Sequence, residues 1–271
     1  MNNEKIIDQL LGKEEIESSA DHDVQLPMEL LAIDIADVPG IYDHSKKIMA
    51  VMMNYKELIM MYTCALKGIR TRFEVLNTEF NLRHQRNPIN FINTRLKRSS
   101  SIVDKLNKNS IPLSVENIEK YIDDVAGIRV ICSYVDDIYL IAQALAKQND
   151  VELISQKDYI SNPKPNGYRS LHMIVRVPVF FEDDVKFVKV EVQIRTIAMD
   201  FWATLEHELK YKNRIPDGNE IASELKECAE IISDADFKML EIRKRIEANR
   251  AESSEEDILI EQMRKLENPV E

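Results

Sequence analysis

Two long stretches of the chain repeat apolar residues at alternating spacings of four and three, which is the spacing of an amphipathic helix. The first ladder runs from Ile48 to Leu76 and the second from Ile221 to Ile246. Each predicts a long helix with one apolar stripe, packed on the protein's own sheet or paired with another subunit. The spacing alone favours packing on the sheet and leaves subunit association open.

Between the ladders the apolar period shortens to two, the period of β-strands. Runs 127–132, 171–177 and 189–195 show this alternation, and helices are expected at 134–147 and 197–212. In the third run apolar positions alternate with polar ones, the latter being Lys189, Glu191, Gln193 and Arg195. The pattern predicts a mixed α/β fold of the α+β kind, with helices on one face of the sheet and charge on the other.

These elements suggest four parts. Residues 1–40 carry Pro27, Pro39 and Gly40 and are interpreted as a variable extension. Residues 41–84 form an N-terminal helix, 85–212 the central domain, and 213–271 C-terminal helices suited to oligomerisation. Strand order does not follow from the sequence.

Charge restricts the class of partner. The chain has 47 acidic and 36 basic residues and a net charge of −11, which argues against general affinity for nucleic acid or anionic membranes. A phosphate ligand must therefore meet a local basic patch. Residues 81–110 supply one, with a single acid, Asp104, against Arg83, Arg86, Arg95, Lys97, Arg98, Lys105 and Lys108.

The cysteines and the apolar runs bear on location. Cys64, Cys132 and Cys228 lie far apart without metal-binding or disulfide-framework spacing, so we expect buried thiols in a reducing cytosol. No run approaches the length of a membrane span, and the chain starts without a signal-like segment. The expected location is the cytoplasm.

The first group of candidate residues is Arg95-x-Lys97-x3-Ser101-x3-Lys105. If the segment is helical throughout, Lys97, Ser101 and Lys105 share one stripe and suit a triphosphate. The alternative is that Ser101 caps a helix together with Asp104, and that the lysines are solvated.

The second group is Asp124 followed by Arg129. Asp124 precedes a buried strand and can hold Mg²⁺. Arg129 is the one charge in that strand, so it should meet an anion, stack on a purine, or pair with a core carboxylate.

The third group spans Lys164 to His172. Pro165 and the Asn166-Gly167 pair predict a tight turn, after which the Tyr168 ring can stack on a base. The alternative is a hairpin turn whose tyrosine packs on the core.

The fourth group begins at Glu191 and Gln193 and continues into a helix that carries Asp200 and Glu206. Glu191 can share Mg²⁺ with Asp124, because this ion takes one or two carboxylates together with phosphate oxygens and water. Gln193 can bind a base edge or a phosphate.

Together these groups resemble the synthetase domain of the RelA/SpoT-type (p)ppGpp synthetases, and the length resembles a stand-alone small alarmone synthetase. The matching segments are INTRLKRSSSIVDKL, DDVAGIRVIC, DYISNPKPNGYRSLHMIV and VEVQIRTIAMDFWATLEHELKYK. The resemblance implies a nucleotidyltransferase-like mixed sheet and a homotetramer formed through the terminal helices. A hydrolase domain is not expected, because too few residues surround His22 and Asp23.

The resemblance also implies a role for each residue. ATP would be bound by Arg95 and Arg129 at the adenine, and by Lys97, Ser101 and Lys105 at the phosphates. Mg²⁺ would be bound by Asp124 and by Glu191, which would also accept the proton of the attacking hydroxyl. GDP or GTP would meet Lys164, Tyr168, Arg169, His172, Gln193, Asp200 and Glu206. Asp200 stands where some relatives have Asn, which leaves its contact with the base open.

The implied reaction moves the β,γ-pyrophosphate of ATP to the 3′-hydroxyl of GDP or GTP. Two other classes stay open on the sequence: a nucleotidyltransferase on a related scaffold, and a non-enzymatic module that binds RNA or nucleotides. The preferred acceptor and any regulation by product or RNA do not follow from the sequence.

Overall fold

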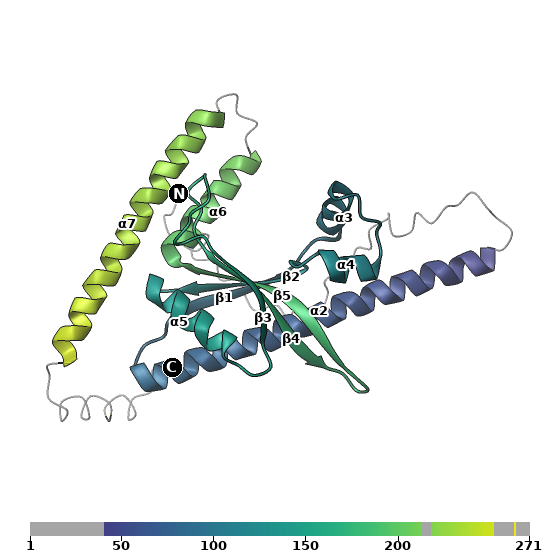
Figure 1. Cartoon of the computed structure of the whole chain (residues 1–271), viewed down its shortest axis with the longest axis horizontal. Coiled ribbons are helices and arrows are strands. Elements are labelled where there is room, and N and C mark those ends of the chain that lie inside the picture. Colours follow the sequence, from purple (N-terminus) through teal and green to yellow (C-terminus); the bar gives the residue numbers. More distant parts are fainter. Residues whose placement is uncertain (1–40, 213–217, 252–262, 264–271) are drawn as a thin grey trace, which may run out of the picture. The chain divides into compact units, whose positions relative to one another are not determined.

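The computed structural model describes residues 41–212, 218–251 and 263 (Figure 1). The chain divides into two compact units, residues 1–56 and 57–271. Of the first unit, only the opening turns of one helix are described. The second unit contains the sheet and the residues discussed below. The predicted extension, 1–40, lies outside the described residues.

Five strands form one mixed sheet in the order β1-β2-β5-β4-β3. Their bounds are β1 (Ile89–Leu96), β2 (Ala126–Cys132), β3 (Glu152–Asp158), β4 (Leu171–Phe180) and β5 (Val185–Thr196). Strands β2 and β5 are parallel and the other pairs are antiparallel. The predicted fold class and the three predicted strands are confirmed. Strands β1 and β3 were not predicted. Strand β3 is exposed over nearly all its length and lacks an apolar alternation.

The helices are α2 (Ile41–His84), α3 (Ser99–Lys108), α4 (Val115–Tyr121), α5 (Val135–Ala146), α6 (Ile197–Lys212) and α7 (Gly218–Ala251). The expected helices at 134–147 and 197–212 correspond to α5 and α6. The two ladders correspond to α2 and α7.

The apolar face of the sheet is covered by α5 and by the part of α2 that follows Glu57 (Figure 1). Along β4, buried side chains alternate with half-buried ones, as the period of two predicts. On α2, Ile69 and Phe73 are fully buried. The Asn77 side chain accepts a hydrogen bond from the backbone N–H of Ile89 at 3.1 Å, which joins α2 to β1. The first ladder therefore packs on the protein's own sheet.

The second ladder behaves differently. Four of its members are exposed, Cys228, Ala235, Met239 and Ile246. The buried side of α7 is instead formed by Ala229, Ser233, Asp236 and Leu240. The buried face is thus rotated from the apolar stripe by about 100°, or one residue. Among the other ladder residues, Leu225 and Ile232 are half-buried and pack against the small core cluster around Trp202 of α6. The ladder thus packs on the protein itself only in part and against helices α6 and α5, while its exposed members leave an apolar stripe at the surface of α7.

Polar contacts hold the buried side of α7. The Thr196 hydroxyl at the end of β5 donates to the Asp236 carboxylate at 2.5 Å, within the interior. Further along α7, Arg243 pairs with Asp136 at the start of α5 and lies over the Tyr134 ring. These contacts fix α7 although its facing surface is only partly apolar.

None of the described helices is long and apolar enough to cross a membrane. Cys64, Cys132 and Cys228 are all free, as predicted, but the expected burial holds only for Cys132, because Cys64 is half-buried and Cys228 is exposed.

Candidate active site

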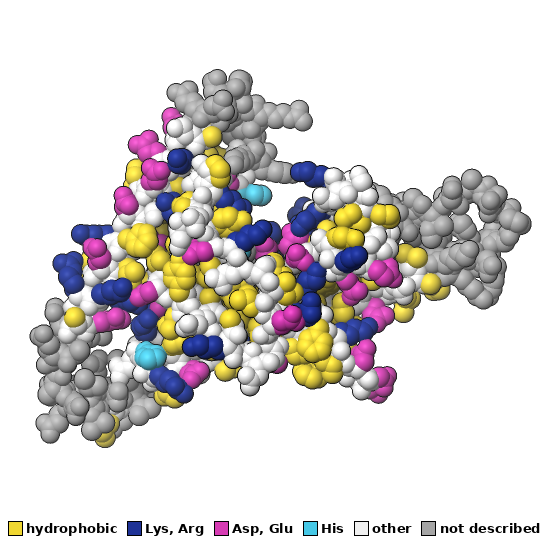
Figure 2. Space-filling model, viewed as in Figure 1, with side chains coloured by type: hydrophobic (Ala, Val, Ile, Leu, Met, Phe, Trp, Pro, Cys, Tyr) yellow, Lys and Arg dark blue, Asp and Glu magenta, His cyan; other side chains and the backbone are white. Residues whose placement is uncertain are grey.

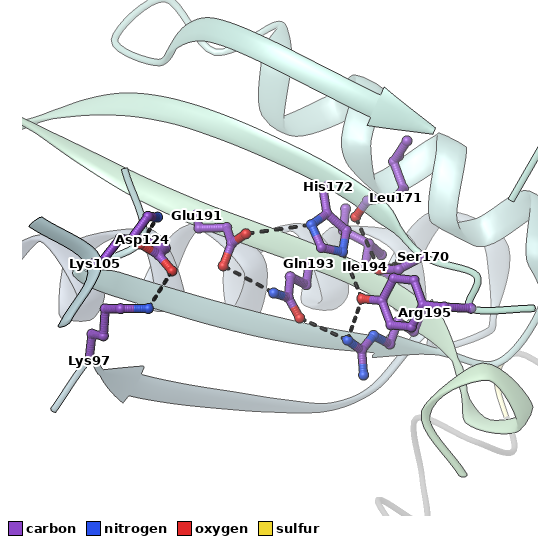
Figure 3. A network of polar contacts seen from close by, with 11 residues as sticks. Lys97, Lys105, Asp124, Ser170, Leu171, His172, Glu191, Gln193, Ile194 and Arg195 are labelled. Atoms are coloured by element: carbon purple, nitrogen blue, oxygen red, sulfur yellow. Dashed lines mark hydrogen bonds and ion pairs between the residues drawn. The ribbon is translucent and has the colours of Figure 1, made fainter. Parts of the chain in front are cut away.

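The charged face of the sheet is centred on β5. Register places Glu191 beside Gly127 of β2, and Gln193 between Arg129 of β2 and His172 of β4. Because side chains of one face repeat every second residue, these groups stand side by side on the polar face. Figure 3 shows Glu191 in polar contact with both Gln193 and His172. The predicted orientation of β5 is confirmed.

Asp124 lies in the turn that leads into β2, at one end of this row (Figure 3). Lys97 donates to one of its carboxylate oxygens at 2.7 Å, and Lys105 donates to the other at 2.8 Å. Burial alone would raise the pKa of Asp124, but hydrogen bonds and charge from Lys105 and Lys97 outweigh it and lower the pKa. Asp124 is therefore a carboxylate at neutral pH, with two ammonium groups beside it.

The local structure around these lysines differs from the helical stripe considered for them. Arg95 belongs to β1, Lys97 lies between β1 and α3, and α3 begins only at Ser99. The stripe that included Lys97 is therefore wrong. The alternative, with Ser101 as helix cap, is also wrong, because Arg98 occupies the cap position. Lys97 and Lys105 nevertheless converge, because both reach Asp124.

Glu191 is half-buried within the row. Gln193 donates to one of its carboxylate oxygens at 3.0 Å, and His172 Nδ1 lies 3.5 Å from the other. Burial and the charge of Asp124 each raise the pKa of Glu191, but the interaction with His172 and the hydrogen bond from Gln193 leave it below its ordinary value. Glu191 therefore carries a negative charge at neutral pH and is able to accept a proton.

Asp124 and Glu191 have the chemistry of a magnesium site. Their side chains are 20% and 15% exposed, so neither points into the hydrophobic interior. The charge of Asp124 is close enough to act on the pKa of Glu191. No group of three or more metal-binding side chains occurs among the described residues. Two carboxylates completed by phosphate and water oxygens fit Mg²⁺.

Beyond Gln193, an aromatic cluster forms the other end of the row. The predicted turn is present: the N–H of Gly167 donates to the carbonyl of Lys164 at 2.8 Å. Lys164 Nζ lies 4.6 Å from the ring centroids of both Tyr159 and Tyr168. Tyr168 also contacts the small core cluster around Trp202. The ring is thus anchored on the core, as the alternative held, while its hydroxyl belongs to the polar row.

Arg129 pairs with a carboxylate, as the alternative for this residue held. Its guanidinium lies 3.2 Å from Asp200 of α6, and Arg195 approaches the same oxygen at 3.0 Å. Burial and the nearby Arg195 lower the pKa of Arg129 from its high ordinary value. These contacts also place Asp200 beside the polar face, so the expectation that α6 covers only the apolar face is wrong.

Arg95 shares a hollow with Arg129. The side chain of Arg95 lies over Gly127, and a Cβ at that glycine would be 3.6 Å from it. The lining of the hollow combines residues of β1, β2 and β5: Asn93, Thr94, Arg95, Gly127, Ile128, Arg129, Glu191 and Gln193. Two guanidinium groups and a carboxylate thus border one space.

Two other sequence candidates have partners of their own. Arg169 donates to the carbonyls of Gly167 and Ala229 and so ties the loop to α7. Glu206 accepts from Asn166 at 2.9 Å, which places it at the same loop. The assigned contacts of Arg169, Glu206 and the remaining candidates with nucleotides stay predictions.

The basic patch of residues 81–110 is not one surface. Arg83 pairs with Glu79 within α2, and Arg86 pairs with the buried Asp137 of α5. Lys97 and Lys105 instead reach the polar face. Figure 2 shows basic and acidic side chains gathered where this face meets α3.

Sequence reasoning missed the importance of Arg195. Only 4% of this residue is exposed, yet its guanidinium contacts Tyr168, Gln193 and Asp200. Its place on the polar side of the third strand run was the available signal. Its partners come from a loop and a helix far along the chain, so spacing could not reveal them.

Comparison with known proteins identifies relatives along most of the chain. Residues 94–216 match the region found in RelA / SpoT proteins. The GTP pyrophosphokinase YwaC of Bacillus subtilis (strain 168) is 43% identical over 206 residues, which cover 75% of this chain and 97% of that protein. The chain belongs to the RelA/SpoT family. A second GTP pyrophosphokinase of that organism, YjbM, is 36% identical over 203 residues, which cover 74% of this RelA/SpoT chain and 90% of YjbM.

Solved structures of the RelA/SpoT relatives have the same fold. The small alarmone synthetase 2 of Bacillus subtilis superposes with a TM-score of 0.63 at 44% identity, covering 70% of this chain and 98% of that one. The small alarmone synthetase 1 of Bacillus subtilis, bound to its product pppGpp, gives a TM-score of 0.65 at 34% identity, covering 71% and 97%.

Proposed function

We propose that the protein is a GTP pyrophosphokinase that transfers the β,γ-pyrophosphate of ATP to the 3′-hydroxyl of GDP or GTP. The observation that carries this proposal is the single row of charged groups across β2, β5 and β4, in a chain 43% identical to a GTP pyrophosphokinase along nearly all of that relative. The lysines of this row can bind phosphates, and Glu191 can accept a proton. A purine base can stack on the arginines at one end of the row and on the Tyr168 ring at the other.

The positions of the site residues support a separate role for each end of the row. Arg95 and Arg129 border the hollow on the β1–β2 side, where they would hold the adenine of ATP. Lys97 and Lys105 would exchange the Asp124 carboxylate for the ATP phosphates, with Ser101 nearby in α3. Tyr168 and Lys164, at the opposite end, would hold the guanine nucleotide, with His172 and Gln193 between the two substrates.

The reaction follows from this placement. The 3′-oxygen of the acceptor attacks the β-phosphorus of ATP, and its bond to that phosphorus forms as the bond between β-phosphorus and the α,β-bridging oxygen breaks. The products are the 3′-pyrophosphorylated guanine nucleotide and AMP. Glu191 accepts the hydroxyl proton. Alignment of the substrates and neutralisation of phosphate charge by the lysines supply most of the rate in such transfers.

Asp124 and Glu191 would hold Mg²⁺ in the substrate complex. The ion would neutralise phosphate charge and draw the acceptor hydroxyl toward the donor phosphate. Asp124 pairs with both Lys97 and Lys105 in this structure, so binding of the ion would free these two ammonium groups for the phosphates.

The product that leaves ATP decides the reaction class. We expect the purified chain, given ATP, Mg²⁺ and GDP or GTP, to release AMP in amounts equal to the 3′-pyrophosphorylated product, as measured by anion-exchange chromatography. Parallel reactions with GMP, GDP and GTP would rank the acceptors. Release of inorganic pyrophosphate would indicate a nucleotidyltransferase, and the absence of turnover despite nucleotide binding would favour a binding module.

The exposed stripe on α7 supports self-association. Ile231, Met239 and Ile246 are 62%, 55% and 52% exposed along one side of the helix. A contiguous apolar stripe of this kind is typical of an interaction surface. We infer a homo-oligomer joined through α7, with the tetramer implied by the family resemblance as the expected state.

A further inference from the structure

Arg195 and Glu191 are joined by two separate arms of polar contacts (Figure 3). In the first arm, Arg195 Nη2 donates to Gln193 Oε1 at 2.9 Å, and Gln193 Nε2 donates to Glu191 Oε2 at 3.0 Å. In the second, Arg195 Nη2 donates to the Tyr168 hydroxyl at 2.6 Å, which lies 2.7 Å from His172 Nε2. His172 Nδ1 then faces Glu191 Oε1 at 3.5 Å.

A guanidinium can only donate, so Arg195 fixes the direction of the first arm. In that arm, Gln193 must turn its amide oxygen toward Arg195, so its NH₂ group faces Glu191. In the second arm, the Tyr168 oxygen accepts from Arg195, and the Glu191 carboxylate fixes the rest, because it favours a proton on the near ring nitrogen of His172 and leaves Nε2 to accept the Tyr168 proton. The neutral His172 ring then carries its proton on Nδ1, toward Glu191. The opposite tautomer would place a bare nitrogen against the Glu191 carboxylate.

The two arms use both protons of Arg195 Nη2. The two Nη2 protons go to Gln193 and Tyr168, while Nη1 donates to Asp200 at 3.0 Å. Arg195 is 4% exposed, so water does not compete freely for these donors. A buried donor with fixed partners orients them more strictly than an exposed one.

We propose that Arg195 is a positioning residue that aims both oxygens of Glu191, through Gln193 on one side and through the Tyr168 hydroxyl and His172 on the other. Tyr168 then has two separable parts: a ring that stacks on the acceptor base, and a hydroxyl that orients the base catalyst. This inference rests on the proposed function for its kinetic consequence, and on geometry alone for the histidine tautomer.

The first test separates the two parts of Tyr168. Tyr168→Phe keeps the ring and removes the hydroxyl. With saturating ATP and varied GDP, we expect the KM for GDP to stay within about twofold, while kcat falls roughly ten- to hundredfold, the usual loss when a partner of a metal-binding or catalytic group is removed. Tyr168→Ala should raise the KM for GDP as well.

Tyr139→Phe is the matched control. The Tyr139 hydroxyl, on α5, donates to Asp158 at 3.1 Å and is not part of either arm. This variant should keep the kcat of the wild-type protein. A normal kcat in Tyr168→Phe, or an effect confined to KM, would overturn the proposal.

The second test does not depend on activity. Nitrogen-15 NMR of the full chain with labelled histidine, assigned by the loss of one signal in His172→Asn, reports which ring nitrogen carries the proton. We expect the Nδ1-protonated neutral tautomer in the wild-type protein and a shift toward the Nε2-protonated form in Arg195→Met. An Nε2-protonated ring in the wild-type protein would refute the arrangement.

The two tests also distinguish failure of this proposal from failure of the proposed function. If the wild-type chain makes no pyrophosphorylated product, the proposed function fails, whereas the tautomer still decides the role of Arg195. If Arg195→Met does not fold, the wild-type tautomer and the Tyr168→Phe kinetics decide it.

Discussion

At the scale of single residues, the proposed chemistry depends on the charge of Glu191 rather than its shape. Glu191→Gln keeps the size of the side chain and a hydrogen-bonding end but removes the proton acceptor and a metal ligand. We expect synthesis to fall by a factor of about 10² to 10⁴, the usual worth of a positioned acid or base. Product formation is measured by chromatography, and ATP and GDP binding by calorimetry.

The binding measurement is the control for that variant. Affinity for both nucleotides in the absence of Mg²⁺ should stay near that of the wild-type protein, because the amide oxygen can still accept the hydrogen bond from Gln193. Synthesis within tenfold of the wild-type rate would remove Glu191 from the role of base.

Residues of this site differ in how far the sequence predicts them. Glu191 and Gln193 follow from the alternation along one strand, since a period of two fixes their side of the sheet. The residue types alone suggest that Lys97 binds phosphates, but they predict the wrong local structure for it. Lys97, Ser101 and Lys105 are spaced four residues apart, as on one helix, although Lys97 lies in the short link between β1 and α3. Arg195 needed the fold, because its partners are distant in sequence.

At the scale of elements, the loop before β4 is fitted closely against α7. Gly167 has φ +87°, and a Cβ there would lie 2.6 Å from the Cβ of Ala229. We expect Gly167→Ala to lower the free energy of unfolding by about 1–3 kcal/mol from the backbone strain alone, with a further loss from the clash. Denaturant unfolding followed by circular dichroism measures this loss.

Gly68→Ala is the matched control for that prediction. Gly68 lies within α2, and a Cβ there would meet only the flexible end of Arg72, at 3.3 Å. Alanine in a helix interior is favoured over glycine by about 0.5–1 kcal/mol. The variant should therefore be as stable as the wild-type protein or slightly more so. Equal losses at both positions would contradict the account given for Gly167.

The contact between α7 and β5 should depend on pH. Burial raises the pKa of Asp236, and the hydrogen bond from Thr196 only partly offsets this. A carboxyl group with a raised pKa in the folded state contributes stability that is present below its unfolded pKa and lost as pH rises through the folded value. The wild-type protein should therefore lose stability relative to Asp236→Asn as pH rises from about 3.8 toward neutrality.

Thermal unfolding of both proteins at several pH values between 4 and 7.5 measures this difference. The asparagine retains an acceptor for Thr196, so the comparison isolates the ionisable proton. A difference in melting temperature that stays constant with pH would show that Asp236 does not titrate differently in the folded protein.

The existence of the long helices could be predicted, but not which side of each is buried. On α2 the apolar stripe is the buried face. On α7 the core accepts Ser233 and Asp236, because Thr196 offers a partner to the carboxylate. A hydroxyl at the end of a strand cannot be matched in advance to a carboxylate forty residues later. The rotation of α7 therefore could not be predicted from periodicity.

At the scale of the whole molecule, the rotated α7 bears on assembly. Met239 lies at the middle of the exposed stripe, so Met239→Glu would place a charge within any interface built on it. We expect the variant to sediment as a smaller species than the wild-type protein in analytical ultracentrifugation. Burying an unpaired carboxylate costs several kcal/mol, roughly, which is enough to dissociate most moderate interfaces.

Lys244→Glu is the matched control, because Lys244 is an exposed residue of α7 that lies about 140° around the helix from Met239. It should leave the sedimentation of the protein unchanged. Identical sedimentation of wild-type protein and Met239→Glu would exclude this stripe as the interface.

The architecture as a whole was predictable in class but not in order. Alternating strand and helix patterns indicate a mixed sheet, and the family motifs place the site on it. The position of β5 between β2 and β4 depends on pairing between segments some sixty residues apart, which no local pattern encodes. That pairing is what brings Arg129, Gln193 and His172 into one row.

The same row fixes the distance between the two nucleotide-binding ends of the site. Neighbouring strands are held about 4.8 Å apart by backbone hydrogen bonds, so the backbones that carry Arg129 and His172 are separated by two strand spacings, or about 10 Å. This interval cannot drift with side-chain substitution. A single compound that tethers adenosine to guanosine should consequently bind best at one tether length, and shorter or longer tethers should engage only one of the two ends.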